Sequence, residues 1–369
     1  MPAFDLGLVL EWLIKAVVLI FALMTGFAYA TYYERKLAAA IQVRIGPNRA
    51  GPFGFLQPAA DAVKVLFKEE FIPDKAYKAI FVLAPILTVV PALVILAVVP
   101  WGGDIVLFGR TVPLGIADVN VGVLYILSVA SISVYGIVLA GWSSNNKYAM
   151  MGGLRSSAQM ISYELALGLA FVGPILLAGS MSMNEIVDGQ QNIWYIVYQP
   201  IGAIIFYIAM LAEVNRAPFD MPEAEQELTA GYHTEYSGMK FALFFMAEYI
   251  KMIAVSAIAA TLFFGGYAGP GVNQWPWLGP IYLLLKVVVL LFGMIWVRAT
   301  LPRIRYDRLM AFGWKIMLPI ALANVFITAI GIYLNALWLI SILTILCMVL
   351  VVYMARNAIG KAGGRRYAE

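Results

Sequence analysis

The sequence predicts an all-α polytopic membrane protein, because the chain is long, very apolar and poor in charge. Of its 369 residues, 62% are hydrophobic and only 12% are charged, whereas a soluble domain usually carries about 25% charged residues. Several apolar runs exceed about 18 residues, the length that crosses a bilayer as a helix. Because lipid cannot satisfy exposed backbone groups, such segments must be helical. These observations argue against a soluble enzyme.

About nine spanning helices are expected, in a single integral membrane domain of residues 1–369. The apolar N-terminus has no basic segment and no small-residue cleavage site, which favours a retained first helix over a signal peptide. The last two helices are separated only by "LNAL" and could be divided differently. The expected helices are about 8–33, 79–100, 119–142, 157–179, 193–213, 241–264, 280–300, 314–334 and 336–355.

Basic residues gather in alternate loops, and this pattern predicts the orientation. Lys and Arg favour the cytoplasmic side of a membrane. The intervening loops, 101–118, 180–192 and 265–279, hold only Arg110. The N-terminus is therefore expected outside and the C-terminus in the cytoplasm, which requires an odd number of helices. The segments that hold 21 of the 25 Lys and Arg residues are 34–78, 143–156, 214–240, 298–315 and the tail after 355.

The first cytoplasmic loop, 34–78, contains an expected amphipathic helix at 55–70. A Gly- and Pro-rich stretch, "RIGPNRAGPFG", precedes it. One reading of this helix is a simple anchor lying along the membrane surface. The other is one wall of a cavity that is entered from the lipid. Apolar residues repeat at helical spacing opposite a polar stripe: Leu56, Ala59, Ala60, Val63, Leu66 and Phe67 against Gln57, Asp61, Lys64 and Lys68.

The cytoplasmic loop 214–240 is unusually acidic and is expected to be partly helical. In "EVNRAPFDMPEAEQELTAGYHTEYSG", Asp220 followed by a proline and Glu223 is typical of a helix start. That explanation leaves out Glu227, which is four residues from Glu223 and repels it. One third of the 21 acidic residues lie within 213–248: Glu213, Asp220, Glu223, Glu225, Glu227, Glu235 and Glu248.

Three of the carboxylates are expected at membrane depth: Glu164 in the fourth helix, Glu213 at the end of the fifth and Glu248 in the sixth. Charges there are costly and mark proton or ion paths. Burial and clustering raise the pKa of a carboxyl group, so such groups can exchange protons near neutral pH.

Structural ion pairing is the alternative, with Glu248 bound to Lys251 and Glu213 bound to Arg216. Across 213–248, however, the seven acids face only Arg216, Lys240 and His233. Lys286, in the seventh helix, is a further candidate counter-ion for Glu248.

The residues needed for a redox centre are missing from the sequence. Cys347 and His233 are the single cysteine and the single histidine. Iron–sulfur clusters need several cysteines, and zinc sites need about four ligands of the Cys or His type. No Gly-rich phosphate loop follows a strand. Any electron carrier is therefore expected on another chain.

A basic face lies near the same membrane surface as the acidic loop. Arg35, in "ERK" at the end of the first helix, and Arg44 could attract a polar or anionic headgroup. The alternative reading is a stop signal that keeps this loop in the cytoplasm.

Four long motifs, in order, carry a resemblance to a known family. They are "RIGPNRAGPFGFLQPAADAVKVLFKE", "GWSSNNKYAMMGGLRSSAQMISYE", "NRAPFDMPEAEQELTAGYHTEYSGMKFALFFMAEY" and "VRATLPRIRYDRLMAFGWK". The chain closely resembles the H-subunit family of bacterial NADH-quinone oxidoreductase, respiratory complex I, whose mitochondrial counterpart is subunit 1 of NADH dehydrogenase. The resemblance covers most of the chain, and the termini and out-facing loops carry little of it.

The resemblance implies a multi-pass subunit of the bacterial inner membrane, placed where the membrane arm of the complex meets its peripheral arm. Quinone, of the ubiquinone or menaquinone type, is the implied substrate. NADH, FMN and the iron–sulfur clusters are implied on partner subunits. The positions matching the quinone chamber are Glu34, Arg35, Arg44, Asp61, Arg216, Phe219 and Asp220. The positions matching the proton path are Glu164, Glu213, Glu223, Glu225, Glu227, Glu235 and Glu248.

The resemblance further implies that the chain forms the membrane part of the quinone-binding chamber and couples quinone reduction to proton translocation through the chain of glutamates. Two alternatives to this coupling function remain. The chain could be mainly a structural anchor that docks the hydrophilic arm, or the equivalent subunit of a related membrane-bound hydrogenase. Some relatives carry a further glutamate in the third helix, where this sequence has Ser131.

Overall fold

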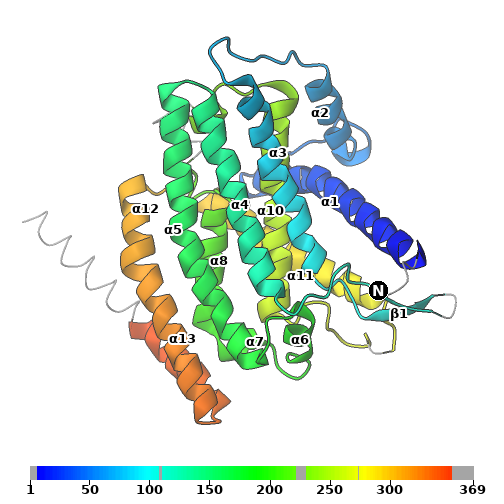
Figure 1. Cartoon of the computed structure of the whole chain (residues 1–369), viewed down its shortest axis with the longest axis vertical. Helices are drawn as coiled ribbons and strands as arrows, with labels where there is room; N and C mark the ends of the chain where they lie inside the picture. The colour runs from blue at the N-terminus through cyan, green and yellow to red at the C-terminus, as the bar shows by residue number, and fades with distance from the viewer. Residues whose placement is uncertain (1–5, 108–109, 222–229, 273, 351–369) are drawn as a thin grey trace, which may run out of the picture.

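Long helices run side by side through the computed structural model of the chain, which describes residues 6–107, 110–221, 230–272 and 274–350 (Figure 1). Within this part of the chain, seven helices are long and apolar enough to cross a membrane. Two shorter apolar helices, α8 (Pro200–Glu213) and the segment Leu337–Leu350, occupy the other two predicted positions. The all-α polytopic prediction is confirmed. The seven are α1 (Leu6–Ile41), α3 (Lys78–Val94) with the 3₁₀ turn η2 (Ile95–Val98), α4 (Gly122–Ser143), α5 (Lys147–Ala178), α10 (Gly238–Phe263), α11 (Leu278–Thr300), and α12 (Tyr306–Phe312) joined through the π-helical turn η4 (Gly313–Met317) to α13 (Leu318–Tyr333).

Several helix ends differ from the predicted ones for local reasons. Helix α1 continues to Ile41 instead of ending at 33, and its charged last turns find partners among the neighbouring elements. Helix α5 begins at Lys147 instead of 157, because the Asn146 side chain caps it by accepting a hydrogen bond from the Tyr148 amide at 3.0 Å. Helix α8 begins at Pro200 instead of 193, because the short helix α7 (Tyr195–Tyr198) ends before this proline.

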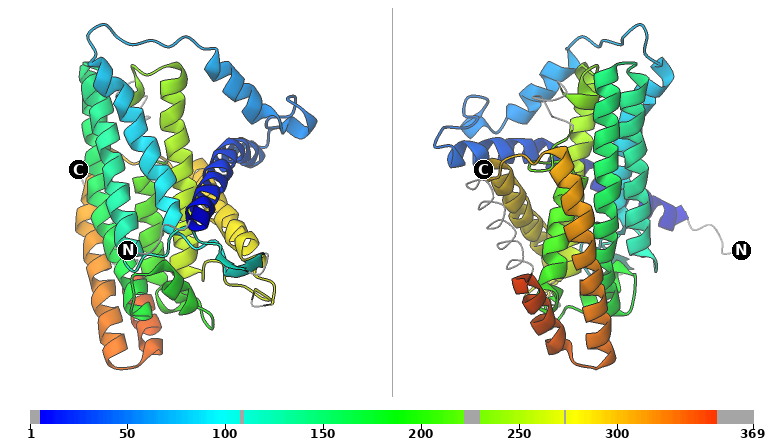
Figure 2. Two further views of the ribbon diagram at one scale, coloured as in Figure 1. Left: turned by 45° about the vertical axis from the view of Figure 1, so that its right-hand side comes forward. Right: turned by 90° about the vertical axis from the view of Figure 1, so that its left-hand side faces the viewer.

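The connecting segments alternate between the two ends of the bundle (Figures 1 and 2). One end carries the loop after α1, the α4–α5 turn, and the segment between α8 and α10 with the 3₁₀ turn η3 (Gly231–His233). The other end carries α6 (Met183–Asp188), α7 and an antiparallel hairpin of β1 (Asp104–Leu107) and β2 (Arg110–Pro113), in which Asp104 pairs with Pro113. This alternation matches the predicted loop pattern. Which end faces the cytoplasm stays a prediction from the charges.

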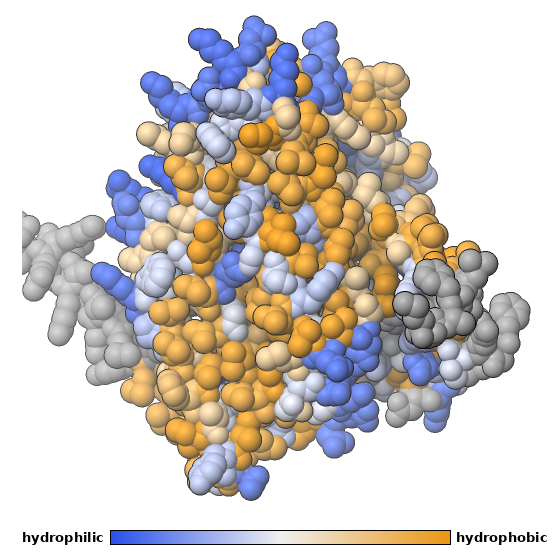
Figure 3. Space-filling model, viewed as in Figure 1, coloured by the Kyte–Doolittle hydropathy of each residue, from blue (hydrophilic) through white to orange (hydrophobic). Residues whose placement is uncertain are grey.

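Close packing of the helices depends on glycines, as Gly136 and Gly152 illustrate. A Cβ on Gly136 of α4 would lie 2.5 Å from Thr88 Cγ2 and 2.9 Å from the Ala84 carbonyl oxygen of α3. A Cβ on Gly152 of α5 would lie 2.5 Å from the Gly231 Cα in η3. Apolar side chains cover the middle of the face seen in Figure 3, and hydrophilic ones gather at the end with the loop after α1. Such an apolar band suits contact with lipid or other membrane subunits.

Helix α2 (Gln57–Leu66) stands apart from the bundle and confirms the amphipathic surface helix, although it is shorter than the predicted 55–70. Its apolar stripe is open, with Val63 53% and Leu66 62% exposed. Its polar face turns to α1, where Arg35 Nη1 lies 2.6 Å from Asp61 Oδ2. The surface helix is therefore linked to the bundle by charge and keeps its apolar side free.

The acidic loop is described on both sides of residues 222–229. The prediction that it is partly helical falls on that range. Glu223, Glu225 and Glu227 therefore lie outside the described residues, and the site is built from the other members of the set.

Candidate functional site

A buried arginine lies where four parts of the chain meet. Arg216, in the turn after α8, is only 3% exposed. Its Nη1 lies 3.1 Å from Glu34 Oε1 of α1, and its Nε lies 2.5 Å from Glu248 Oε1 of α10. The guanidinium also stacks over Tyr249, 4.4 Å from the ring centroid. Arg298 of α11 forms a second ion pair with Glu34. We call Glu34, Arg216, Glu248 and Arg298 the arginine cluster.

Opposite charges compensate one another in the arginine cluster. Burial by itself lowers the pKa of Arg216, but Glu248 and Glu34 beside it raise that pKa above its ordinary value. The guanidinium therefore stays charged at any working pH. The cluster ties α1, α10 and α11 to the turn after α8.

A glutamine of α5 holds that turn in place. Gln159 is fully buried, and its Nε2 lies within hydrogen-bonding distance of three oxygens: Ala212 O at 2.9 Å, Asn215 Oδ1 at 3.2 Å and Phe219 O at 2.7 Å. Asn215 has a φ of 55°, a left-handed conformation that asparagine tolerates better than most residues. Local geometry and the Gln159 contacts together position the turn. Sequence reasoning missed Gln159, although a glutamine within the apolar fourth helix was a visible signal.

A second group of polar side chains lies deeper in the bundle. Glu213, the last residue of α8, is buried, and its Oε2 has no hydrogen-bond partner. It interacts electrostatically with Lys251 of α10 and Glu164 of α5. Helix α4 supplies two hydroxyls: Ser133 Oγ accepts a hydrogen bond from Lys251 Nζ at 2.6 Å, and Ser131 Oγ donates one to Glu164. The third spanning helix therefore contributes two hydroxyls to this group.

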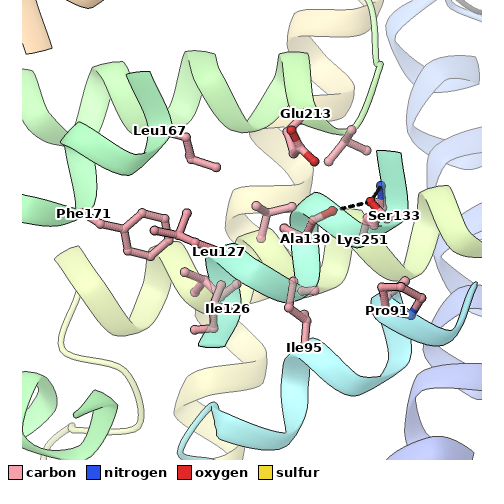
Figure 4. Close-up of a pocket in the computed structure, with 15 residues that line it drawn as sticks. Pro91, Ile95, Ile126, Leu127, Ala130, Ser133, Leu167, Phe171, Glu213 and Lys251 are labelled. Carbon is pink, nitrogen blue, oxygen red and sulfur yellow. Dashed lines mark hydrogen bonds between the residues drawn. The ribbon is translucent and has the colours of Figure 1, made fainter. Parts of the chain in front are cut away.

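Two small cavities meet at Glu213 and Lys251. The first leaves about 40 Å³ in which the centre of a water molecule fits. It is otherwise lined by apolar side chains such as Leu127 and Phe171, with Ser133 beside the lysine (Figure 4). A water molecule needs roughly 10–15 Å³ of such space and two to four polar partners. The volume of this cavity is sufficient for water, but its lining is almost wholly apolar, so its polar groups are confined to the end with Glu213, Lys251 and Ser133.

The second cavity leads toward the arginine cluster. It leaves about 30 Å³ for water centres and is lined by Asp220, His233 and Glu248 as well as by Glu213 and Lys251. The two cavities share Glu213, Val214 and Lys251 in their linings, one lying toward the acidic turn and the other toward the interior of the bundle. The carboxylates that line them are Glu213, Asp220 and Glu248, and Glu164 interacts with both Glu213 and Lys251.

The structure shows a different ion pair from the two considered in the sequence: Glu248 pairs with Arg216, while Lys251 interacts electrostatically with Glu213, Glu248 and Glu164. Arg216 binds Glu248 instead of Glu213. Lys251 is the cation that acts on Glu213, while its hydrogen bond goes to Ser133. The prediction paired residues that are close in sequence, whereas the turn after α8 carries Arg216 away from Glu213 and onto α1 and α10.

Lys286 is not the counter-ion of Glu248 that the sequence suggested. Its Nζ donates to the carbonyl oxygens of Gly266 at 2.7 Å and Ala268 at 2.9 Å. The ammonium also lies 5.3 Å from the Trp194 ring centroid. These partners belong to the end of the bundle with β1, α6 and α7. Lys286 therefore holds the loop that follows α10.

The residues matched to the quinone chamber fall into several places. Glu34 and Arg216 belong to the arginine cluster, and Asp220 lines the second cavity. Arg35 pairs with Asp61 between α1 and α2. Arg44 is exposed, and its Nε donates to Gln42 at 2.7 Å. Phe219 is buried, with its ring 5.5 Å from that of Tyr163. Of the remaining acids, Glu235 accepts a hydrogen bond from Asn146 at 2.6 Å.

His233 does not supply the positive charge considered for it in the sequence. It is buried among aromatic rings, with the Tyr232 ring 3.9 Å and the Phe244 ring 5.3 Å away. Its Nδ1 has no hydrogen-bond partner. Burial lowers the pKa of His233 to about 3, so the ring is neutral near pH 7. This leaves the acids around the second cavity with still fewer cations.

Replacing His233 with phenylalanine is expected to make the protein less sensitive to acid. The unfolded chain binds a proton at a pKa of about 6.5, whereas the folded one binds it only near pH 3. Stability that is present above pH 6.5 is therefore lost as the pH falls toward 3, by at most about 1.4 kcal/mol per pH unit. The apparent melting temperature of the purified assembly at pH 7 and pH 5 measures this. The fall should be smaller for His233→Phe than for wild type, and equal falls would contradict the prediction.

The sequence is similar to a known protein family and to several of its members. Residues 14–329 match the family model described as NADH dehydrogenase. The chain is 54% identical over 305 residues to the H subunit of NADH-quinone oxidoreductase from Protochlamydia amoebophila, covering 83% of this chain and 92% of that one. It is 50% identical over 317 residues to an H subunit of the same oxidoreductase from Geobacter metallireducens, covering 86% and 94%. It is 50% identical over 323 residues to the H subunit from Thermomicrobium roseum, covering 85% and 93%.

Proposed function

The chain belongs to the NADH dehydrogenase family that includes the H subunits of bacterial NADH-quinone oxidoreductases, and from this premise we propose how it works. It forms the membrane part of a quinone-binding chamber and couples quinone reduction to proton translocation. Its partners are the other membrane-arm and peripheral-arm subunits, and the electron carriers belong to those partners. Within the described residues, no group of three or more His, Cys, Asp or Glu could hold a metal ion.

One observation carries the proposal: charged groups and cavities follow one another from the arginine cluster into the bundle. Glu34 and Glu248 flank Arg216 at one end. The second cavity runs from Glu248 to Glu213, and the first continues from Glu213 toward the apolar interior. Polar groups at membrane depth are costly, so a connected series of them points to a functional path.

The quinone end of this path is proposed near α1, α2 and the turn after α8. Arg35 and Asp61 present an ion pair between the first two of these elements. Glu34 lies one residue before Arg35 and contacts Arg216, so a charge change near α1 reaches the cluster directly. Arg44, Phe219 and Asp220 complete the proposed lining.

The magnitude of the electrostatic effect suits coupling. Two electrons arriving at a quinone create negative charge that protons must neutralise. A unit charge about 10 Å from a carboxylate, at an effective dielectric constant of about 20, interacts by roughly 1.7 kcal/mol. That energy changes the proton affinity of the carboxylate by more than about tenfold. The effect matters only for groups that already exchange protons near neutral pH, and clustered buried carboxylates are such groups.

The proposed location is a bacterial inner membrane with the N-terminus outside and the C-terminus in the cytoplasm. The support is the gathering of Lys and Arg in alternate loops. In this orientation the acidic turn and the arginine cluster lie toward the cytoplasm. A quinone reduced there would take its protons from the cytoplasmic side, which is also the side where the proposed proton path begins.

Replacing Glu213 with glutamine in the assembled complex tests the proposed function. Glutamine has nearly the same shape but binds no proton, so quinone reductase activity coupled to pumping is expected to fall at least about tenfold. Glu164→Gln should act in the same direction. Activity with a soluble quinone and proton uptake into proteoliposomes are the measurements.

Glu185→Gln is the matched control, because Glu185 of α6 is an exposed acid at the opposite end of the bundle. It should leave turnover and pumping unchanged. Wild-type turnover and pumping in both Glu213→Gln and Glu164→Gln would overturn the coupling proposal. Salt-sensitive loss of the peripheral arm, with normal chemistry in what stays assembled, would favour a structural anchor instead.

A further inference from the structure

Lys251 occupies the junction between the two cavities. It extends from α10 and, with Glu213 and Val214, lines both of them. In Figure 4 its ammonium lies beside Ser133, near the same cavity that Glu213 faces from α8. A lysine at membrane depth costs roughly 2.5–3.5 kcal/mol. Because burying Lys251 is unfavourable and its side chain lines both cavities, we expect a specific role for it.

The packed elements around Lys251 bring three carboxylates near it. Glu213 comes from α8 and Glu164 from α5, and Glu248 lies one turn earlier on α10 itself. Helix α4 contributes the Ser133 hydroxyl, 2.6 Å from Nζ. Helix α3 contributes apolar contacts from Pro91 and Ile95 to the same cavity. Lys251 is therefore surrounded by acids on three helices.

The way Lys251 is bound differs from the way Arg216 is bound. Arg216 lies within 3.1 Å of carboxylate oxygens on two helices and is stacked on an aromatic ring. The hydrogen bond of Lys251 goes to a neutral hydroxyl, while the carboxylates lie around it. Its four-carbon stem is flexible and its ammonium has three rotatable donors. Lys251 can thus exchange one acid partner for another, which a locked ion pair cannot do.

We propose that Lys251 is the proton relay that joins the two cavities, passing protons between the Glu248 side and Glu213. The inference rests on the proposed function. In the step, one N–H bond of the ammonium breaks and the proton goes to a carboxylate oxygen of Glu213. The neutral amine then takes a proton that has first reached the second cavity, held there as the carboxylic acid form of Glu248 or as a hydronium ion, and this restores the ammonium. Glu213 passes its proton on into the bundle before the next cycle. One proton moves per cycle, and the step needs no oxidant or reductant.

A static counter-charge is the competing role, and arginine distinguishes the two. Arginine keeps the positive charge, but its guanidinium does not release a proton in proteins. If Lys251 only balances charge, Lys251→Arg should work as wild type does. If Lys251 relays protons, the arginine variant should assemble and still pump poorly.

The experiment compares Lys251→Arg and Lys251→Met with wild type in the assembled, reconstituted complex. Quinone reductase activity and proton pumping, each between pH 6 and 9, are expected to fall at least about tenfold in both variants. The pH profile of the arginine variant is expected to be flatter than that of wild type, because no titrating amine remains. If Lys251→Met does not assemble, Lys251→Arg decides alone. Turnover, pumping and pH profile equal to wild type in Lys251→Arg would overturn the relay.

Two further variants make the outcome specific. Lys286→Met removes another lysine from a spanning helix, but its ammonium binds backbone carbonyls at the far end of the bundle. It should leave the pH profile of the assembled complex unchanged. Glu213→Gln is measured in parallel: its loss of activity together with wild-type behaviour of both Lys251 variants would sink the relay alone. Turnover and proton pumping equal to wild type in both Glu213→Gln and Glu164→Gln would contradict the proposed function itself.

Discussion

Replacing Arg216 with methionine is expected to leave little assembled, active complex. Methionine fills much of the space but leaves Glu34 and Glu248 without their shared cation, although Arg298 still contacts Glu34. Removing one partner of a buried ion pair costs about 3–5 kcal/mol. Because this is a large share of the stability of any domain, the yield of assembled complex and its apparent melting temperature should both fall sharply. Turnover per assembled complex should fall as well, because the turn that carries Asp220 loses its anchor.

Three variants separate charge from geometry at this position. Arg216→Lys keeps the charge but cannot reach two carboxylates with a planar fork, so an intermediate loss is expected. Arg216→Met combined with Glu248→Gln should recover part of the stability and none of the turnover. Arg305→Met is the control, because Arg305 forms an exposed pair with Asp307 at 3.3 Å, and exposed pairs contribute only about 0–1 kcal/mol. A melting temperature and turnover for Arg216→Met like those of the control would contradict the prediction.

The fold was predictable because its signals are strong and local. Apolar runs as long as a bilayer is thick identify spanning helices, and a lipid environment allows few other structures. The helix ends were less predictable, because they depend on caps and tertiary partners. Helix α5, capped by Asn146, begins ten residues before the predicted start, and the charged end of α1 continues past the lipid-length segment to Ile41. Hydropathy carries no information about either.

The acidic members of the candidate site stood out in the sequence, whereas their partners did not. Composition and helix position identified Glu164, Glu213 and Glu248 as costly carboxylates. Their partners depend on how the turn after α8 folds, and that turn directs Arg216 toward α1 and α10. Sequence neighbours were therefore poor guides to contacts.

A related limit applies to single polar residues in apolar helices. The sequence analysis gave no role to Gln159 or Ser133, and considered Lys251 only as a partner of Glu248. The structure brings Ser133 and Lys251 together across α4 and α10, and it places Gln159 under the turn that carries Arg216. In this chain, isolated polar residues within spanning helices position the charged ones.

Replacing Gln159 with methionine is expected to damage both stability and turnover, because this side chain contacts three oxygens of the turn. Methionine has a similar volume but donates no hydrogen bond, so the carbonyl oxygens of Ala212 and Phe219 lose a buried donor. A net hydrogen bond contributes about 1 kcal/mol, and leaving its buried partner unsatisfied costs about 1–3 kcal/mol. A loss of about 3 kcal/mol in stability is therefore expected. Since displacements of about 1 Å can cost up to about a hundredfold in rate, turnover per assembled complex should fall about tenfold.

Gln190→Met is the control that tests whether the loss of turnover comes from the turn that carries Arg216. Gln190 is equally buried and donates to two backbone carbonyls, Ile186 O at 3.0 Å and Thr261 O at 2.8 Å, at the opposite end of the bundle. Gln190→Met should lose at least as much stability as Gln159→Met, because Gln190 Oε1 also accepts hydrogen bonds from the amides of Tyr195 at 3.3 Å and Gly265 at 3.0 Å. Only Gln159→Met should lower the rate of quinone reduction in complexes that have assembled. Equal rates in the two variants would mean that the turn carrying Arg216 tolerates displacement, and that its position does not limit coupling.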